Sequence, residues 1–213
     1  LFESQYPVPD GISYNSYLIM DEKIAIMDTV DRRESTAWWS NIEHLLEGRT
    51  PDYLIVQHME PDHTGTIAEA VERYPGLQVV ASARALQILP QYFGTTDFAQ
   101  RTIAVKEGDT LSLGHHTLQF VMAPMVHWPE VMVTYDQAAR VIFSADAFGT
   151  FGALRGAIIA DSTTGSPAWP DEARRYYFNI CGKYGAPVQT LLKKFSTLDI
   201  ATICPLHGPV LTA

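Results

Sequence analysis

The sequence predicts an α/β protein in which two β-sheets pack face to face between outer layers of helices. Three observations support this fold class. Strand and helix patterns alternate in the first half of the chain, residues 102–148 read almost entirely as strands, and two helical stretches precede a final short strand. With 213 residues, 46% of them hydrophobic, the chain can bury a sizeable core.

The first half contains the alternating elements. Residues 14–20 and 24–27 are rich in β-branched and aromatic side chains and predict two strands joined by a polar turn. Helical spacing of apolar side chains predicts a helix over Ser35–Leu46, and the run Tyr53–Val56 is typical of a strand buried on both faces. Beyond them we expect a helix at 67–74, a strand at 77–81 and a short helix at 83–89 ended by Pro90.

The second half is expected to form mainly strands up to residue 148, with turns at Gly108, Gly114 and Asp136. Two helices, at 171–184 and 188–196, should follow. They precede a last strand at Thr202–Cys204. We therefore expect one set of helices outside each sheet.

Composition narrows the possible partners. The chain has 24 acidic and 15 basic residues, and its net charge of -9 would repel a phosphate backbone, so nucleic acid is not expected as a partner. No run reaches the roughly 20 apolar residues of a membrane-spanning helix, and no secretory signal begins the chain, so no membrane association is expected. Cys181 and Cys204 are expected to be reduced thiols in a cytoplasmic protein.

We expect residues 1–213 to form a single domain, because no repeat, low-complexity segment or linker interrupts them. The first residue is Leu rather than Met. The chain also stops shortly after His207-Gly208-Pro209, so it could be a fragment of a longer protein.

Residues with metal-binding side chains follow four of the predicted strands. Imidazole and carboxylate groups are the ligands that divalent transition metals take in proteins. Seven such groups are too many for one four-coordinate ion, so their number suggests two metals that share a bridging ligand. The set is His58, Glu60, Asp62, His63, His127, Asp146 and His207.

The spacing of the first cluster has a physical reason. Alternate residues of an extended loop project to one side, so His58, Glu60 and Asp62 are expected to face one point. His63 would join them only if the chain turns at Thr64-Gly65. The alternative is that these residues form ion pairs on the surface or that Asp62 caps a helix. That alternative does not explain why His127, Asp146 and His207 also follow predicted strands.

This pattern resembles the metal-binding set of the flavodiiron proteins, a branch of the metallo-β-lactamase superfamily. The spacings agree: 64 positions separate His63 from His127, another 19 lead to Asp146, and 61 more lead to His207. The segments 14–19, 127–130, 146–149 and 207–209 resemble the family as well, so the resemblance covers essentially the whole chain.

The resemblance implies a metallo-β-lactamase-like αββα sandwich with two iron ions in a centre of the Fe–O–Fe type. The first iron would be bound by His58, Glu60 and His127. The second would be bound by Asp62 and His207, with His63 as a further candidate. Asp146 would bridge the two ions.

By the same resemblance the protein would be a non-haem diiron protein that binds and reduces dioxygen or nitric oxide. Hydrolytic members of the superfamily carry His at the position of Glu60. A carboxylate there favours iron or manganese over zinc, whose protein shells usually contain more nitrogen or sulfur. The alternatives are a non-catalytic diiron oxygen sensor and a dizinc hydrolase, and Glu60 argues against the hydrolase.

Flavodiiron proteins usually continue into a flavodoxin-like domain that binds FMN, and the flavin of one subunit serves the iron site of the other in a head-to-tail dimer. This sequence shows no such region and no Gly-rich dinucleotide fingerprint, so FMN is not expected on this chain. We expect a homodimer that takes electrons from an external donor such as a flavoprotein or rubredoxin, or that contacts a signalling partner.

Several aromatic residues are weaker candidates for the surroundings of the site. Tyr14, Tyr176, Tyr177 and Trp128 could line a substrate pocket, although such residues more often pack in the core. The polar stretch 162–167 could border the site or a subunit interface.

Overall fold

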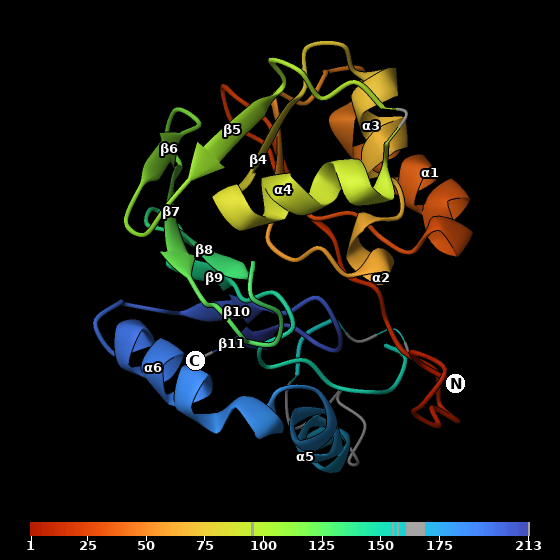
Figure 1. The fold of residues 1–213 in the computed structure, drawn as a ribbon, viewed down its shortest axis with the longest axis vertical. Helices are drawn as coiled ribbons and strands as arrows, with labels where there is room; N and C mark the ends of the chain where they lie inside the picture. Colours follow the sequence, from red (N-terminus) through yellow and green to blue (C-terminus); the bar gives the residue numbers. More distant parts are fainter. Residues whose placement is uncertain (95, 155, 157, 161–168, 213) are drawn as a thin grey trace.

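The computed structural model describes residues 1–94, 96–154, 156, 158–160 and 169–212, and they form two β-sheets flanked by helices (Figure 1). The polar stretch 162–167 lies outside the described residues. The expected fold class is confirmed by this arrangement of two sheets between helical layers.

The first sheet has the order β1-β2-β3-β4-β5, and β2 to β5 run parallel while β1 is antiparallel to β2. Helices α1, α3 and α4 cover its outer face (Figure 1). The strands are β1 Tyr17–Ile19, β2 Ala25–Met27, β3 Tyr53–Val56, β4 Gln78–Ser82 and β5 Thr102–Val105; the helical segments are a 3-10 turn at Arg32–Glu34, α1 Ser35–Leu46, α2 Pro61–Thr64, α3 Ile67–Arg73 and α4 Ala83–Tyr92.

The second sheet has the order β11-β10-β9-β8-β7-β6 and is antiparallel except for the β9–β10 pair. Helices α5 and α6 pack on its outer face. Its strands are β6 Thr110–Ser112, β7 Thr117–Met122, β8 Met132–Asp136, β9 Val141–Phe143, β10 Thr202–Cys204 and β11 Leu211–Thr212; the helical segments are α5 Trp169–Ile180, a 3-10 turn at Gly182–Tyr184 and α6 Gly185–Phe195.

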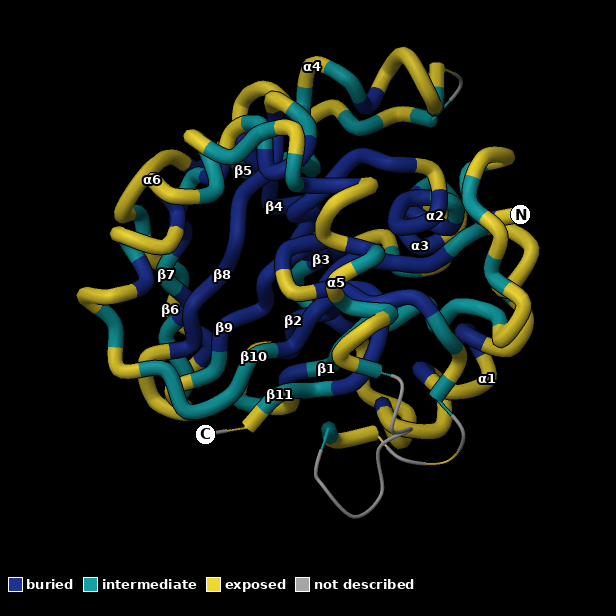
Figure 2. The backbone as a smooth tube through the Cα atoms, turned by 90° about the horizontal axis from the view of Figure 1, so that it is seen from below, coloured by how far each residue is buried: buried dark blue, intermediate teal, exposed yellow. Residues whose placement is uncertain are grey.

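Three apolar cores hold these layers together, and Figure 2 shows the central strands β2, β3, β4 and β8 among the most deeply buried parts of the chain. Strand β3 illustrates why. Because successive side chains of a strand point to opposite faces, Leu54 and Val56 pack towards the helices whereas Ile55 packs between the two sheets. The prediction of a strand buried on both faces is therefore confirmed.

Proline explains two errors in the expected helix ends. Helix α4 continues past Pro90 to Tyr92, because a proline in the last turn removes only one hydrogen bond while Leu89 remains buried in the core. Helix α6 begins at Gly185 rather than at Val188, because Pro187 lies in the first turn, where its missing N–H would have no partner. The expected helix at 171–184 is also interrupted, since α5 ends at Ile180 and a 3-10 turn follows.

Both cysteines are buried thiols without a disulfide. Among the helices of the described residues, none is long and apolar enough to cross a membrane.

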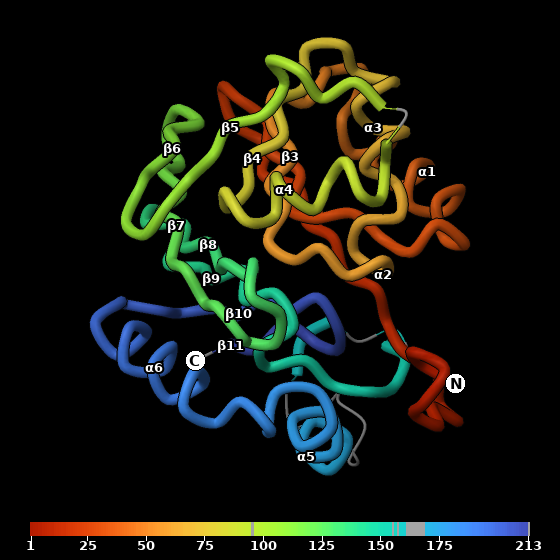
Figure 3. The backbone as a smooth tube through the Cα atoms, viewed as in Figure 1, coloured from red at the N-terminus to blue at the C-terminus, as the bar shows by residue number. Residues whose placement is uncertain are grey.

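The first residues of the chain, red in Figure 3, lie beside the segment around Gly152, where Gly11 O accepts a 3.0 Å hydrogen bond from Gly152 N.

The short helix α2 packs closely against the chain that follows β2. A Cβ atom added at Gly65 would lie 2.8 Å from the carbonyl oxygen of Val30 and would collide with the backbone nitrogen of Arg32. Both obstacles are backbone atoms, so neither can move aside without shifting the turn that carries them.

We therefore expect Gly65→Ala to lower the free energy of unfolding by about 1–3 kcal/mol, as overpacking typically does. Urea unfolding followed by circular dichroism measures the loss. Gly76→Ala is the matched control, because a Cβ there meets nothing within 4 Å. Equal stability of the two variants would show that α2 can move away from Arg32 at no cost.

Candidate metal centre

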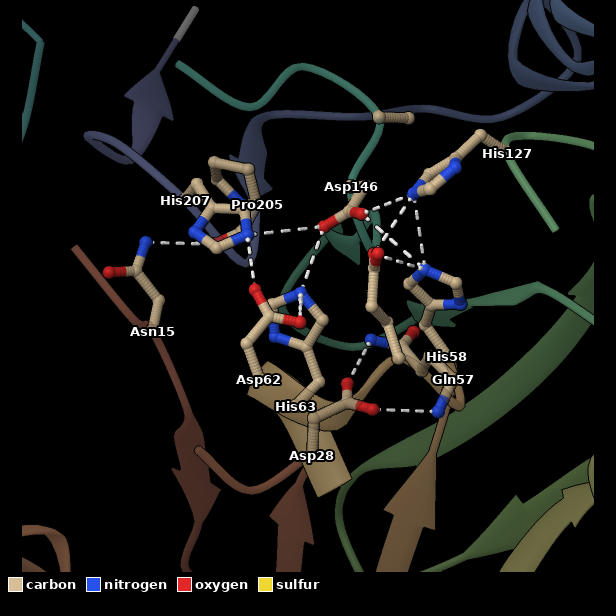
Figure 4. A network of polar contacts seen from close by, with 12 residues as sticks. Asn15, Asp28, Gln57, His58, Asp62, His63, His127, Asp146, Pro205 and His207 are labelled. Carbon is tan, nitrogen blue, oxygen red and sulfur yellow. Dashed lines mark hydrogen bonds and ion pairs between the residues drawn. The ribbon is translucent and has the colours of Figure 1, made fainter. Parts of the chain in front are cut away.

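All seven predicted side chains meet at one edge of the two sheets (Figure 4). Loops that follow strands carry five of them: β3 leads to His58 and Glu60, β7 to His127, β9 to Asp146 and β10 to His207. Helix α2 carries Asp62 and His63. All seven residues are buried, so their polar atoms have little access to water.

The first group consists of His58, Glu60, His127 and Asp146. Glu60 Oε2 lies 3.1 Å from Nε2 of both His58 and His127. Asp146 Oδ2 lies 3.0 Å from His127 Nε2, and the two imidazole Nε2 atoms are 3.3 Å apart. Two nitrogens and two oxygens therefore surround one point.

The second group consists of Asp62, His63 and His207. Asp62 Oδ2 lies 3.2 Å from His207 Nε2, and Asp62 Oδ1 lies 3.5 Å from His63 Nε2. The other carboxylate oxygen of Asp146, Oδ1, lies 3.1 Å from His63 Nε2 and 3.6 Å from His207 Nε2. Asp146 thus directs one oxygen to each group, which is the geometry of a bridging carboxylate.

The expectation that His58, Glu60 and Asp62 face one point is wrong. Pro61 starts helix α2 directly after Glu60, whose backbone is still extended. The helical turn moves Asp62 away from His58 and Glu60 and places it with His63 in the second group. Proline at the first helical position favours this change because its φ angle suits a helix start.

The hydrogen bonds within the site show that its donor atoms fit a cation. His207 Nδ1 donates to Ser13 O at 2.7 Å, so in the neutral ring Nε2 carries a lone pair. That atom faces Asp62, and neither it nor the two carboxylate oxygens of Asp62, all buried, has a hydrogen-bond partner among the described residues. Two acceptors that face each other away from water are stable only with a proton or a cation between them.

His58 is oriented by Glu130, a residue that the sequence reasoning did not single out. Glu130 Oε1 accepts hydrogen bonds from His58 Nδ1 at 2.8 Å and from Met59 N at 2.9 Å. A carboxylate on the far nitrogen of an imidazole is the usual support of a metal-binding histidine. The segment His127-Trp128-Pro129-Glu130 contained the signal that could have identified it.

Two polar side chains fix the loops of the site. Asn15 Nδ2 donates to Pro205 O at 2.9 Å and to Gly208 O at 2.7 Å, so it clamps the loop of His207. The buried Asp28 accepts from Gln57 N at 2.7 Å and from Gln57 Nε2 at 2.8 Å, which holds the start of the β3 loop. Burial raises the pKa of Asp28 to about 6.

The N-terminal turn is a second feature that sequence reasoning missed. The ring of Phe2 packs edge-on against His207 at 5.2 Å and against Phe151 at 5.9 Å. The next residue, Glu3, has a buried oxygen without a hydrogen-bond partner among the described residues. Burial, together with the nearby charge of Glu60, raises the pKa of Glu3 to about 8.

Three of the four aromatic candidates contact the site. Trp128 stands perpendicular to the ring of His58 at 5.3 Å, and the rings of Tyr14 and Tyr176 each lie 5.7 Å from that of His207. Tyr177 differs because its ring does not contact a residue of the site. It packs against Phe178, and the residue is exposed to solvent.

Imidazole and carboxylate groups shift each other's pKa in this site. Burial opposes charge, yet Asp146 and Glu60 raise the pKa of His127 to about 9. Burial also opposes ionisation of Glu60, but His127 and His58 lower its pKa to about 2. Burial would also raise the pKa of Asp146, but His63 and His127 hold it well below its usual range. Without a metal, protons therefore occupy the positions that a cation would take.

Two sheets between helical layers, with two clusters of potential metal ligands joined by one carboxylate, define a β-lactamase-like domain with a candidate metal centre. Residues 12–208 match the family described as ODP family beta lactamase, and the chain belongs to this family, in its flavodiiron branch. The resemblance to flavodiiron proteins and the expected fold are thereby confirmed.

Similar proteins agree with this assignment. The chain is 34% identical to diflavin flavoprotein A 1 of Synechocystis sp., over 99% of this chain and 36% of that protein. It is 32% identical to the anaerobic nitric oxide reductase flavorubredoxin of Aliivibrio salmonicida, over 97% of this chain and 41% of that protein. The chain therefore spans less than half the length of these relatives.

Solved structures show the same fold. Rubredoxin oxygen:oxidoreductase of Desulfovibrio gigas superimposes with a TM-score of 0.89 at 29% identity, over 97% of this chain and 51% of that chain. The flavodiiron protein of Giardia intestinalis gives a TM-score of 0.86 at 26% identity, over 99% of this chain and 50% of that one.

The role of Glu130 can be tested by removing its carboxylate. Glu130→Ala should weaken metal binding about 10–100-fold, the usual effect of losing such a support. Glu130→Gln should stay close to the wild type, because its amide oxygen can still accept from His58 Nδ1. Titration against a metal chelator measures both. If Glu130→Ala binds metal as tightly as the wild type, packing alone orients His58.

Metal binding should also depend on pH. The pKa of His63 and that of His127 are each about 9 in the metal-free site, so below that pH a bound cation must displace their protons. Apparent affinity should therefore rise from about pH 6 to pH 9, by up to about tenfold per pH unit for each proton displaced. Competition titrations across this range measure the slope, and a flat profile would mean that both rings are already neutral.

Proposed function

We propose that the chain holds two iron ions at the seven residues described above and uses them to bind and reduce dioxygen or nitric oxide. The observation that carries this proposal is the position of Asp146, whose two oxygens face two separate groups of donor atoms at 3.0 and 3.1 Å. A single carboxylate placed in this way can hold two ions at a fixed separation.

The donor set supports iron over zinc. Glu60, Asp62 and Asp146 bring three carboxylates to the site, and hard oxygen donors suit iron or manganese better than they suit zinc. The same three groups make a dizinc hydrolase the weaker candidate. When bound, a pair of ferrous ions would supply the electrons for the reduction.

The residues of the chain would then have distinct roles. Glu130 would hold His58 in the orientation that directs Nε2 to the first ion, and Asn15 would hold the loop of His207 beside the second. The buried hydroxyl of Tyr176 has no partner among the described residues, so it can donate a hydrogen bond to a ligand near His207. Burial of all seven side chains keeps bulk water from the reacting atoms.

The electron source is a further part of the proposal. Among the similar proteins are a flavorubredoxin and a rubredoxin oxygen:oxidoreductase, whose names point to flavin and rubredoxin as donors. We propose that this chain likewise receives electrons from a flavoprotein or rubredoxin. Reduction of dioxygen to water needs four electrons, of which a pair of bound ferrous ions would provide only two, so turnover would require such a donor.

Protein purified without oxygen should contain about two irons per chain, and Asp146→Ala should lose both because it removes the shared ligand. Elemental analysis measures the metal.

Mixing the reduced protein with dioxygen in a stopped-flow spectrometer should show one fast step, with turnover only after a flavoprotein or rubredoxin donor is added. A stable oxygen adduct that never turns over would indicate a sensor. A zinc protein that hydrolyses esters or lactams and ignores dioxygen would refute the proposal.

A further inference from the structure

A cavity of about 410 Å³ lies between helices α5 and α6 and reaches the bridging carboxylate. Asp146 lies at the inner end, and the loop that follows it, which includes Phe148, lines one wall. Apart from that loop, its walls come mainly from the two helices, which follow one another on the outer side of the second sheet (Figure 1). The helix residues include Trp169, Ala173 and Tyr176 of α5 and Val188, Leu191 and Leu192 of α6.

The lining of this cavity is almost entirely apolar. Its polar contributors are Asp146, Gln189 and the tyrosine hydroxyls, and the remaining side chains are aliphatic, aromatic or a cysteine. Apolar cavities of this kind bind water poorly and accept small apolar molecules such as xenon. The cavity therefore differs in chemistry from the charged groups at its inner end.

The cavity also connects solvent with a buried site. Phe148, Tyr177 and Leu192 at its rim are 38%, 38% and 41% exposed, whereas Asp146 at the inner end is only 1% exposed. Tyr176 belongs to the same lining and is fully buried, with a hydroxyl that lacks a partner among the described residues. A molecule that enters at the rim thus meets apolar walls until it reaches these two polar groups.

A neutral diatomic gas fits this path better than an ion does. Neither dioxygen nor nitric oxide carries a charge, so the acidic surface of a chain with net charge -9 does not attract them. Their concentration near the metals can be raised only by a space that favours apolar molecules. We propose that the cavity between α5 and α6 is the route by which dioxygen or nitric oxide reaches the metal centre. This inference rests on the proposed function.

The first test asks whether the cavity accepts an apolar atom, with no reaction involved. Xenon-129 NMR, or diffraction from crystals pressurised with xenon, should detect xenon beside Ala173 in the wild-type protein. Ala173→Phe should abolish this signal because its ring would occupy the space beside position 173. Leu45→Trp is the control, since Leu45 lies on α1, is 53% exposed and does not line the cavity. Absence of xenon from the wild type would overturn the proposal.

The second test measures the rate of arrival. Stopped-flow mixing of the reduced, iron-loaded protein with dioxygen gives a second-order rate constant. Ala173→Phe should lower it about tenfold, an increase in barrier of about 1.4 kcal/mol. Leu192→Trp narrows the exposed rim without touching the core and should act in the same direction. Leu45→Trp should leave the rate unchanged, and all variants should keep the wild-type iron content.

The possible outcomes separate the two proposals. If both cavity variants react at the wild-type rate while Ala173→Phe excludes xenon, the route is wrong and the proposed function stands. If the iron-loaded wild-type protein reacts with neither dioxygen nor nitric oxide, the proposed function is wrong and the route falls with it. Slow reaction in both cavity variants, with a normal rate in the control, supports the route.

Discussion

The arrangement of the site depends on one buried carboxylate placed among four imidazole rings. Asp146 is 1% exposed, and its two oxygens lie within 3.6 Å of nitrogens of His58, His63, His127 and His207. A charge removed from water in this way is costly unless opposite charges surround it. The loops of both sheets must therefore reach Asp146 together, because a missing ring would leave part of this charge without compensation.

The two sheets are joined by hydrogen bonds at the same edge. Met132 N, at the start of β8, donates to Gln57 O after β3 at 3.0 Å, and Ser82 Oγ at the end of β4 donates to Glu130 O at 2.7 Å. Between the sheets an apolar core that includes Ile55 and Phe120 fixes their separation. The apolar core sets the distance between the layers, and the polar contacts set the register at which the loops of the site face one another.

Features that depend on neighbouring residues could be predicted from the sequence, whereas features that depend on contacts between distant residues could not. Helix α1 and strand β3 were predicted to the residue because their apolar patterns are determined within a few neighbouring positions. The seven side chains of the site could be predicted as a set from their placement after strands, and the family resemblance also implied their division into two groups. The alternation of an extended loop did not predict this division, because the helical turn at Pro61 moves Asp62 away from Glu60. Glu3 lies near Glu60, and its neighbour Phe2 packs on the distant His207; no pattern near the N-terminus encodes these contacts.

The charge of the site bears on which ligands it can accept under the proposed function. The carboxylates of Glu60 and Asp146 lie 3.1 and 3.0 Å from the same atom, His127 Nε2, so two negative charges lie close together, and the chain as a whole is acidic. Two bound ferrous ions would outweigh the three carboxylates by about one positive charge, so the centre itself would attract an anion only weakly, while the acidic chain opposes its approach. A neutral diatomic molecule does not meet this opposition, and the apolar lining beside Asp146 offers it a favourable surrounding. Under the proposed function, the acidic donor set and the apolar cavity would therefore favour the same kind of small, uncharged ligand by independent physical means.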